Sequence, residues 1–162
     1  WAVGNTITHG TSSTPFSPYK SCTRAEIVTF LWRAAGSPEP TTTRNPFRDV
    51  NAVTHSSYYK AILWASQKGI TSGTSTTAFS PDQVCTRAQI VTFLYRALHG
   101  TPGEQTKFTD VSADAFYGEA VSWAVTNGVT SGTSAVTFGP NADCTRAQIV
   151  TFIYRAMAEK SA

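Results

Sequence analysis

The chain has 162 residues and a formal net charge of +3, and 41% of its residues are hydrophobic whereas 14% are charged. This length and apolar content support one or two domains with packed cores. No run approaches the ~20 apolar residues that cross a bilayer, and the amino terminus has no signal-peptide pattern. We therefore expect no membrane insertion. Because basic residues do not cluster as in nucleic-acid-binding arms, we also expect no nucleic-acid partner.

One phrase occurs three times, as CTRAEIVTFLWRA from Cys22, CTRAQIVTFLYRA from Cys85 and CTRAQIVTFIYRA from Cys144. Residues upstream of each phrase stay in register, among them three tryptophans and three glycines: Trp1, Trp64 and Trp123; Gly10, Gly73 and Gly132. The copies lie 63 and then 59 residues apart, a period that suits one small supersecondary unit per repeat. The chain is therefore predicted to be a tandem array.

A second signature, Phe47-Arg48-Asp49-Val50, returns as Phe108-Thr109-Asp110-Val111 and opens the later repeats. We divide the chain into repeat 1 at 1–38, a linker at 39–46, repeat 2 at 47–100, a linker at 101–107 and repeat 3 at 108–162. Trp1 stands where the tryptophan of each later repeat stands, so residue 1 falls in the middle of a repeat. We expect repeat 1 to leave apolar surface uncovered or to take a helix from upstream sequence or another chain.

Each complete repeat is predicted to contain a helix, a turn-rich loop and a second helix, which makes the fold mainly α. Apolar residues at helical spacing over 58–68 and 117–127 predict the first helices. Clusters of glycine, serine, threonine and proline, such as 69–75, then predict a loop with a short extended piece.

The second helix of each repeat begins inside the repeated phrase. Threonine at the N-cap and Glu or Gln three residues later form a capping box, and the three pairs are Thr23 with Glu26, Thr86 with Gln89 and Thr145 with Gln148. Gly36 and Gly100 are the predicted stops. We expect these amphipathic helices to cluster around a pseudo-threefold axis, burying Ile27, Ile90 and Ile149.

The three cysteines, one in each repeat, cannot all pair within one chain, so we do not expect a disulfide framework. Two interpretations of them are open: convergence on a metal ion, or burial as small hydrophobic side chains that staple the helix starts. Packing explains these positions without a metal, and we expect neither a metal nor a cofactor.

An arginine occupies the first helical position of every copy, at Arg24, Arg87 and Arg146. A cation there faces the positive end of the helix dipole, which is unfavourable unless something offsets it. One interpretation is an anion bound by the guanidinium and the free amides of the helix start. The other is an ion pair with an acid of a neighbouring repeat, such as Asp49 or Asp110.

The ordered set of Phe-x-Asp-Val, Trp-Ala, Gly-Ile-Thr-x-Gly, Phe-x-Pro and Thr-Arg-Ala-Glu resembles the S-layer homology domain over nearly the whole chain. The resemblance implies three repeats in a pseudo-threefold helical domain with grooves between them. It implies a noncatalytic module at the bacterial cell wall or S-layer that binds an acidic, often pyruvylated, secondary cell-wall polysaccharide. Other surface-layer proteins or further domains of the same protein are the remaining expected partners.

Carried over by motif, the family's acidic-sugar arginine falls on Arg24, Arg87 and Arg146. The other candidate glycan-binding residues are an acid, an aromatic, a glycine and a hydroxyl from each complete repeat: Asp49, Trp64, Gly73 and Thr74; Asp110, Trp123, Gly132 and Thr133. Each has a structural alternative. The acids can cap a turn, the tryptophans can be core, and the glycines can simply permit a turn.

Catalytic patterns are missing from the repeats. His9, His55 and His99 are not equivalent positions, no carboxylate pair recurs, and no nucleophile elbow or phosphate loop appears. We therefore expect a binding module and not an enzyme. The alternative is a structural or protein-assembly module with the same fold and no affinity for glycan.

Overall fold

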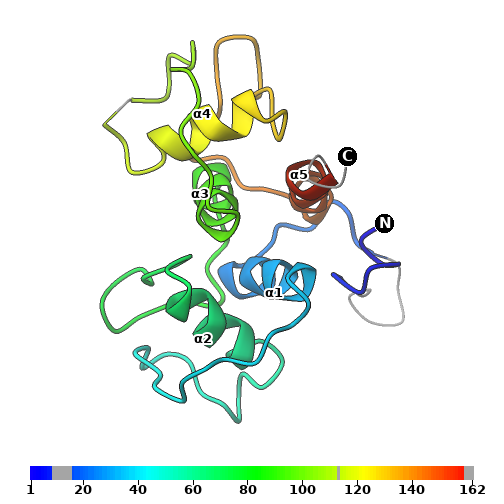
Figure 1. Cartoon of the computed structure of the whole chain (residues 1–162), viewed down its shortest axis with the longest axis vertical. Helices are drawn as coiled ribbons and strands as arrows, with labels where there is room; N and C mark the ends of the chain where they lie inside the picture. The colour runs from blue at the N-terminus through cyan, green and yellow to red at the C-terminus, as the bar shows by residue number, and fades with distance from the viewer. Residues whose placement is uncertain (9–15, 113, 159–162) are drawn as a thin grey trace. The chain divides into compact units, whose positions relative to one another are not determined.

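The computed structural model describes residues 1–8, 16–112 and 114–158. Within them the helices are α1 Arg24–Ala34, α2 Tyr59–Gln67, α3 Arg87–Ala97, α4 Gly118–Thr126 and α5 Arg146–Ala158 (Figure 1). They are connected by turns and loops with isolated β-bridges. The mainly α prediction is confirmed. No helix in the described part of the chain is both long and apolar enough to traverse a bilayer.

The chain forms two compact units, each of which draws on more than one repeat. Unit 1 comprises Trp1–Ser17 and Cys22–Val84, and unit 2 comprises Pro18–Ser21 and Cys85–Ala162. Unit 1 therefore combines the second helix of repeat 1 with most of repeat 2. Unit 2 combines the second helix of repeat 2 with repeat 3 and a short piece of repeat 1. Gly10 lies outside the described residues.

In unit 1, α1 packs against α2. Ile27 and Val28 of α1 and Ile62 of α2 are at most 1% exposed, as the helical spacing of apolar residues predicts. The start of α1 is closed by the predicted capping box. The Glu26 carboxylate accepts from the Thr23 N–H at 2.9 Å, and Thr23 Oγ1 accepts from the Glu26 N–H at 3.3 Å.

In unit 2, α3 packs against both α4 and α5. Helices α3 and α5 both begin at the predicted capping boxes, which are Thr86 with Gln89 and Thr145 with Gln148. The three staple isoleucines, Ile27, Ile90 and Ile149, are each at most 1% exposed.

The cysteines are free thiols, and Cys22, Cys85 and Cys144 are all fully buried. Burial raises the pKa of Cys144 to about 11, although the neighbouring Arg87 acts in the opposite direction. The described residues contain no group of His, Cys, Asp or Glu side chains able to hold a metal ion. The positions fit the hydrophobic interpretation of the cysteines.

Each second helix docks its first turn onto the loop of another repeat. The first helical N–H donates to a backbone carbonyl at 2.9 Å in all three cases: Arg24 to Gln83, Arg87 to Ala142 and Arg146 to Lys20. The next N–H donates to a proline carbonyl: Ala25 to Pro81, Ala88 to Pro140 and Ala147 to Pro18. Repeat 1 thus docks on repeat 2, repeat 2 on repeat 3, and repeat 3 on repeat 1. The pseudo-threefold axis stays a prediction.

The two predicted helix stops differ in the structure. α1 ends as predicted, with Gly36 in the left-handed region at φ +86°. After α3 that conformation belongs to His99, at φ +51°, so the prediction that Gly100 makes the stop is wrong. Gly100 instead permits close packing, because a Cβ there would lie 2.6 Å from the Tyr95 ring and 2.8 Å from the Trp123 ring.

Candidate functional site

The three helix-start arginines are buried. Arg24 and Arg87 are 3% and 4% exposed. Arg24 Nε donates to the Phe79 carbonyl at 2.8 Å and its Nη2 to Thr71 Oγ1 at 3.4 Å. Its guanidinium lies 4.9 Å from the centre of the Phe79 ring, a cation–π distance.

Arg87 repeats this arrangement in unit 2. Its Nε donates to the Phe138 carbonyl at 2.9 Å, its Nη2 donates to Thr130 Oγ1 at 3.2 Å, and its guanidinium lies 4.9 Å from the Phe138 ring centre. Arg146 is equally buried, at 3% exposed. The favourable partners that offset the helix dipole are therefore a carbonyl dipole and an aromatic face.

The two signature aspartates accept hydrogen bonds from the backbone N–H groups of the same two phenylalanines. Asp49 accepts from the Phe79 N–H at 2.9 Å and from the Ser80 N–H at 2.7 Å. Burial alone would raise the pKa of Asp49, but these backbone donors hold it below its ordinary value.

Asp110 does the same in unit 2, accepting from the N–H groups of Phe138 and Gly139, both at 2.8 Å. Its pKa is likewise lowered: burial raises it, and the two backbone donors and the charge of Arg87 outweigh that effect. The acid and the arginine thus meet at one phenylalanine backbone. We call Asp49–Phe79–Arg24 and Asp110–Phe138–Arg87 the phenylalanine clamps.

The clamps support an exposed loop that carries the predicted hydroxyls, residues 73–80 in unit 1 and 132–139 in unit 2, which we call the hydroxyl loops. Gly73 begins the first at φ +88°, and a Cβ there would lie 2.3 Å from the Ala78 carbonyl oxygen. The Thr74 N–H donates to that same carbonyl at 2.8 Å, and Thr74 Oγ1 lies 2.7 Å from Ser80 Oγ. The loop is therefore held by its own hydrogen bonds.

The second hydroxyl loop is built in the same way. Gly132 has φ +90°, and a Cβ there would lie 2.6 Å from the Thr137 carbonyl oxygen. The Thr133 N–H donates to this carbonyl at 2.9 Å, and Thr133 Oγ1 lies 3.0 Å from Thr137 Oγ1. Both loops present threonine and serine hydroxyls on an exposed turn.

Arg48, between Phe47 and Asp49 in the signature of repeat 2, was missed as a candidate. It is exposed, and its N–H donates to the Thr77 carbonyl of the hydroxyl loop at 2.8 Å. Thr109 takes its place beside the loop of unit 2, where its N–H donates to the Val136 carbonyl at 2.9 Å. The sequence signal for Arg48 was that it occupies the one position at which the Phe-x-Asp-Val signatures of repeats 2 and 3 differ.

The predicted tryptophans are core residues in both units. Trp64 is 7% exposed and Trp123 is 5% exposed, whereas Trp1 is 49% exposed. In unit 2 the Tyr95 ring meets Trp123 edge-on, with 5.9 Å between ring centres. This burial fits the packing interpretation of Trp64 and Trp123.

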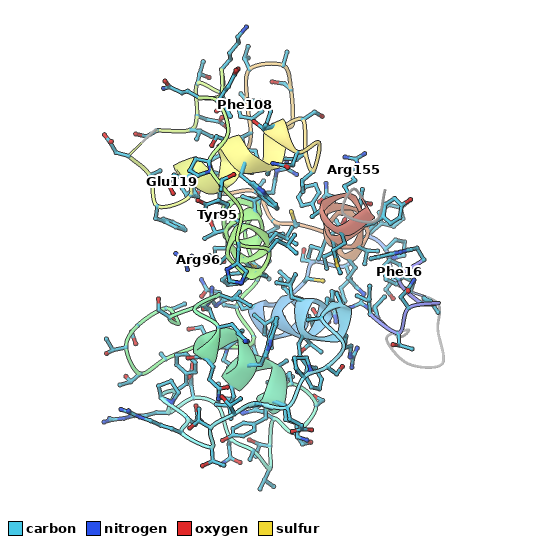
Figure 2. The ribbon with its side chains drawn as sticks, in the orientation of Figure 1. Phe16, Tyr95, Arg96, Phe108, Glu119 and Arg155 are labelled. Carbon is cyan, nitrogen blue, oxygen red and sulfur yellow. The ribbon has the colours of Figure 1, made fainter. Side chains whose placement is uncertain are left out.

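Unit 2 also contains a cavity of about 250 Å³ between its linker and the start of α4. Its lining residues are Pro102, Gly103, Gln105, Thr106, Val111, Gly118, Glu119 and Ser122. Tyr95 of α3 donates its hydroxyl to the Glu119 carboxylate of α4 at 3.2 Å, and both side chains are labelled in Figure 2. The sequence had no signal for this cavity, because its linker residues belong to no repeated motif.

These repeated helices, docked loops and clamps define the chain as a tandem helix–loop–helix repeat module. The sequence profile of the S-layer homology domain matches residues 46–91 and 107–150, more than half of the chain. The chain belongs to the S-layer homology family. Domains of this family are non-catalytic anchoring modules, and this chain is a cell-surface anchoring module of bacterial type.

Three relatives are similar to the chain. An endoglucanase of Bacillus sp. (strain KSM-635) is 32% identical over 86% of this chain and 15% of its own length. The surface-layer 125 kDa protein of Lysinibacillus sphaericus is 33% identical over 54% of this chain and 8% of its own length. A cell surface protein of Thermoanaerobacter kivui is 30% identical over 71% of this chain and 16% of its own length. The chain thus spans a small part of each relative.

Proposed function

We propose that this module anchors its protein by binding an acidic polysaccharide of the bacterial cell wall, as the resemblance to the family implies, without catalysing a reaction. The observation that carries the proposal is the pair of hydroxyl loops. Each loop exposes a cluster of hydroxyls on a turn that is already held by internal hydrogen bonds and by a phenylalanine clamp. Such a pre-organised polar surface suits sugar hydroxyls, because little conformational freedom is lost on binding.

In this proposal the clamp arginines position the loops, and an exposed cation reads the acidic substituent. Arg24 and Arg87 already donate to a phenylalanine carbonyl and a threonine hydroxyl from buried positions. Arg48 is exposed beside the first hydroxyl loop, where its planar guanidinium can pair with a carboxylate. The formal net charge of +3 also favours the binding of an acidic polymer.

Binding of purified secondary cell-wall polysaccharide tests the proposal, with the polymer used intact and after removal of its acidic substituents. We expect the intact polymer to bind more tightly and added salt to weaken its binding. Arg48→Thr should weaken binding of the intact polymer by about 1.5–3 kcal/mol and leave the treated polymer unaffected. Thr109→Arg is the matched variant, which should strengthen binding of the intact polymer.

A structural or protein-assembly role is the second candidate, favoured by the burial of Arg87 and Trp123. That role predicts no binding of either polymer by a folded chain. Equal binding of the intact and the treated polymer would show that the chain binds glycan but does not recognise the acidic substituent.

A further inference from the structure

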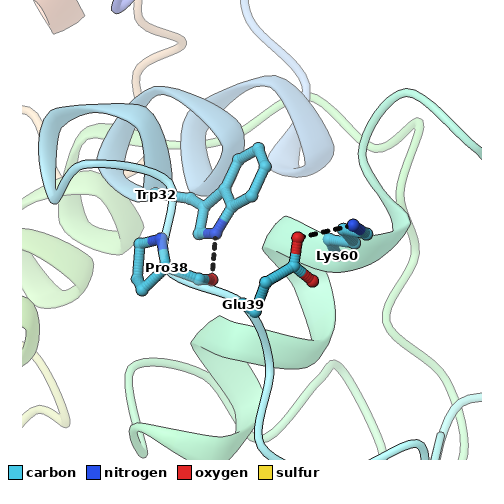
Figure 3. Close-up of polar contacts among 4 residues, drawn as sticks. All are labelled: Trp32, Pro38, Glu39 and Lys60. Carbon is cyan, nitrogen blue, oxygen red and sulfur yellow. Dashed lines mark hydrogen bonds and ion pairs between the residues drawn. The ribbon is translucent and has the colours of Figure 1, made fainter.

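The place where the linker passes the start of the first helix is built differently in the two units. In unit 1 the Lys60 ammonium lies 2.6 Å from the Glu39 carboxylate of the linker (Figure 3). In unit 2 the position of Lys60 is taken by Glu119, which lines the cavity of about 250 Å³. The charge that the helix carries at this position is therefore reversed between the units.

The cavity of unit 2 follows from small residues at the start of α4. Gly118 and Ser122 both line it, and the equivalent positions of α2 carry Tyr59 and Leu63. Leu63 is 4% exposed, so its side chain is packed in unit 1. Glycine and serine in place of tyrosine and leucine remove most of two side chains from this wall, which leaves a cavity where the neighbouring chain does not fill the space.

The linker side of the cavity is held by the backbone of Gly103. Its N–H donates to Ser122 Oγ at 3.2 Å, and the Ser122 hydroxyl donates in turn to the Glu119 backbone carbonyl at 2.9 Å. A Cβ on Gly103 would collide with the Thr126 hydroxyl, so only glycine lets the linker approach α4 this closely. These contacts form the cavity before any ligand enters, which lowers the entropic cost of binding.

Glu119 brings a negative charge to the cavity. In the part of the chain that the structure describes, its carboxylate pairs with no lysine or arginine, and its partner is the Tyr95 hydroxyl, which donates to Oε2 at 3.2 Å. A neutral phenol orients the carboxylate and leaves its charge in place. The other lining side chains supply hydroxyls, an amide and apolar surface: Thr106 and Ser122; Gln105; Pro102 and Val111.

We propose that this cavity binds one amino sugar residue, a sugar with an unsubstituted and protonated amino group, and that the ammonium pairs with the Glu119 carboxylate. The Lys60–Glu39 pair supports the ammonium, because unit 1 holds that group against a carboxylate at the same place. The volume is below the ~300–1,000 Å³ of sites for larger ligands and suits a single ring. The choice of a sugar rests on the proposed function, but none of the lining residues belongs to a hydroxyl loop.

Titration of the whole chain with monosaccharides tests the site. Glucosamine carries the protonated amine, and glucose has a neutral hydroxyl in its place. The backbone amide signals of Gly103, Glu119 and Ser122 are followed by NMR. We expect saturable shifts with glucosamine and a Kd about tenfold or more higher for glucose, because only glucosamine forms a charge-assisted hydrogen bond with the carboxylate.

Two variants separate the charge from the cavity. Glu119→Gln should raise the Kd for glucosamine about tenfold or more and leave that for glucose unchanged, and Glu104→Gln, at an exposed acid of the same linker, is the matched control. Gly118→Tyr with Ser122→Leu gives unit 2 the residues of unit 1 and should abolish the shifts in a folded chain, because α2 already accommodates that pair.

Equal Kd values for glucosamine and glucose, or an unchanged Kd for glucosamine in Glu119→Gln, would overturn the proposal. So would free lysine binding as tightly as glucosamine, since the site would then recognise an amine without a sugar. The monosaccharide reports on the cavity alone, whereas Arg48→Thr and the intact polymer report on the hydroxyl loops. A failure of the cavity proposal is therefore distinguishable from a failure of the proposed function.

Discussion

The linkers of the two units lie beside equivalent helices but differ in the side-chain contacts that they make with those helices. In unit 1, Lys60 pairs with Glu39 at 2.6 Å, and the Trp32 indole N–H donates to the Pro38 carbonyl at 2.8 Å (Figure 3). In unit 2 the equivalent of Lys60 is Glu119, which accepts from Tyr95 and lines the cavity of about 250 Å³.

The phenylalanine clamps, in contrast, are the same in both units to within 0.2 Å in each of their hydrogen bonds. The two units therefore share the clamp residues, which join the helix start, the hydroxyl loop and the signature aspartate. They differ at the linker, where unit 1 has the Lys60–Glu39 pair and unit 2 has the cavity lined by Glu119, and we call this region the linker face. We therefore expect substitutions in the clamp to cost much more stability than substitutions on the linker face.

Arg87→Ala should cost the most, about 2–4 kcal/mol of unfolding free energy. It removes two hydrogen bonds and the cation–π contacts with Phe138 and Phe152, and it leaves the buried Phe138 carbonyl without its side-chain donor. Chemical denaturation measures the loss, and Lys107→Ala is the control on an exposed basic residue of the same unit. A loss below about 0.5 kcal/mol would show that the clamp does not stabilise unit 2.

Gly73→Ala should cost about 2–3 kcal/mol, because the new Cβ would lie 2.3 Å from the Ala78 carbonyl oxygen at a residue with φ +88°. Gly36→Ala is a matched control with nearly the same φ, +86°, and nothing within 4 Å of the added Cβ. It should cost about 1 kcal/mol. Equal losses in the two variants would attribute the whole effect to φ and none to the loop contacts.

Acid should weaken the clamps. The pKa of Asp110 and that of Asp49 are lowered in the folded chain, so their contribution to stability is present above the unfolded pKa of about 4 and is lost as the pH falls through the folded pKa. Asp110→Asn should therefore flatten the fall of Tm below about pH 4 relative to the original chain. Asp114→Asn, at an exposed aspartate of the same unit, is the control. An unchanged acid profile in Asp110→Asn would contradict the role of Asp110.

The linker face should give the smallest effect. Lys60 and Glu39 have side chains that are 55% and 72% exposed, so solvent screens their attraction. A double-mutant cycle with Lys60→Gln and Glu39→Gln should give a coupling of about 0.5 kcal/mol or less. A coupling above about 1.5 kcal/mol would show that this ion pair, and not only the clamp, stabilises unit 1.

Local signals predicted the helices and their starts well. The predicted first helix over 58–68 is α2 at Tyr59–Gln67, and the capping boxes are present because their partners are three residues apart in sequence. The partner of Arg24 was out of reach, since the Phe79 carbonyl lies 55 residues away and a backbone atom leaves no trace in residue type. The left-handed residue after α3 is His99 and not Gly100 for a similar reason. Gly100 is needed where the chain packs closely against Trp123, a contact between residues that are distant in sequence.

The central claim, that the clamp arginine positions the hydroxyl loop and does not itself bind the polysaccharide, is tested by comparing two variants of unit 2. Affinity for the intact wall polysaccharide is measured for Arg87→Ala and Thr133→Val, each at a temperature where denaturation shows the variant to be folded. We expect Thr133→Val to weaken binding by about 0.5–1.5 kcal/mol and to lower Tm less than Arg87→Ala does, since it removes only the exposed hydroxyl contacts with Thr137. We expect Arg87→Ala to lower Tm more, while its folded form loses less affinity than Thr133→Val. A folded Arg87→Ala chain that loses about 1.5–3 kcal/mol of binding, with Thr133→Val unchanged, would contradict the claim and make the arginine a direct contact.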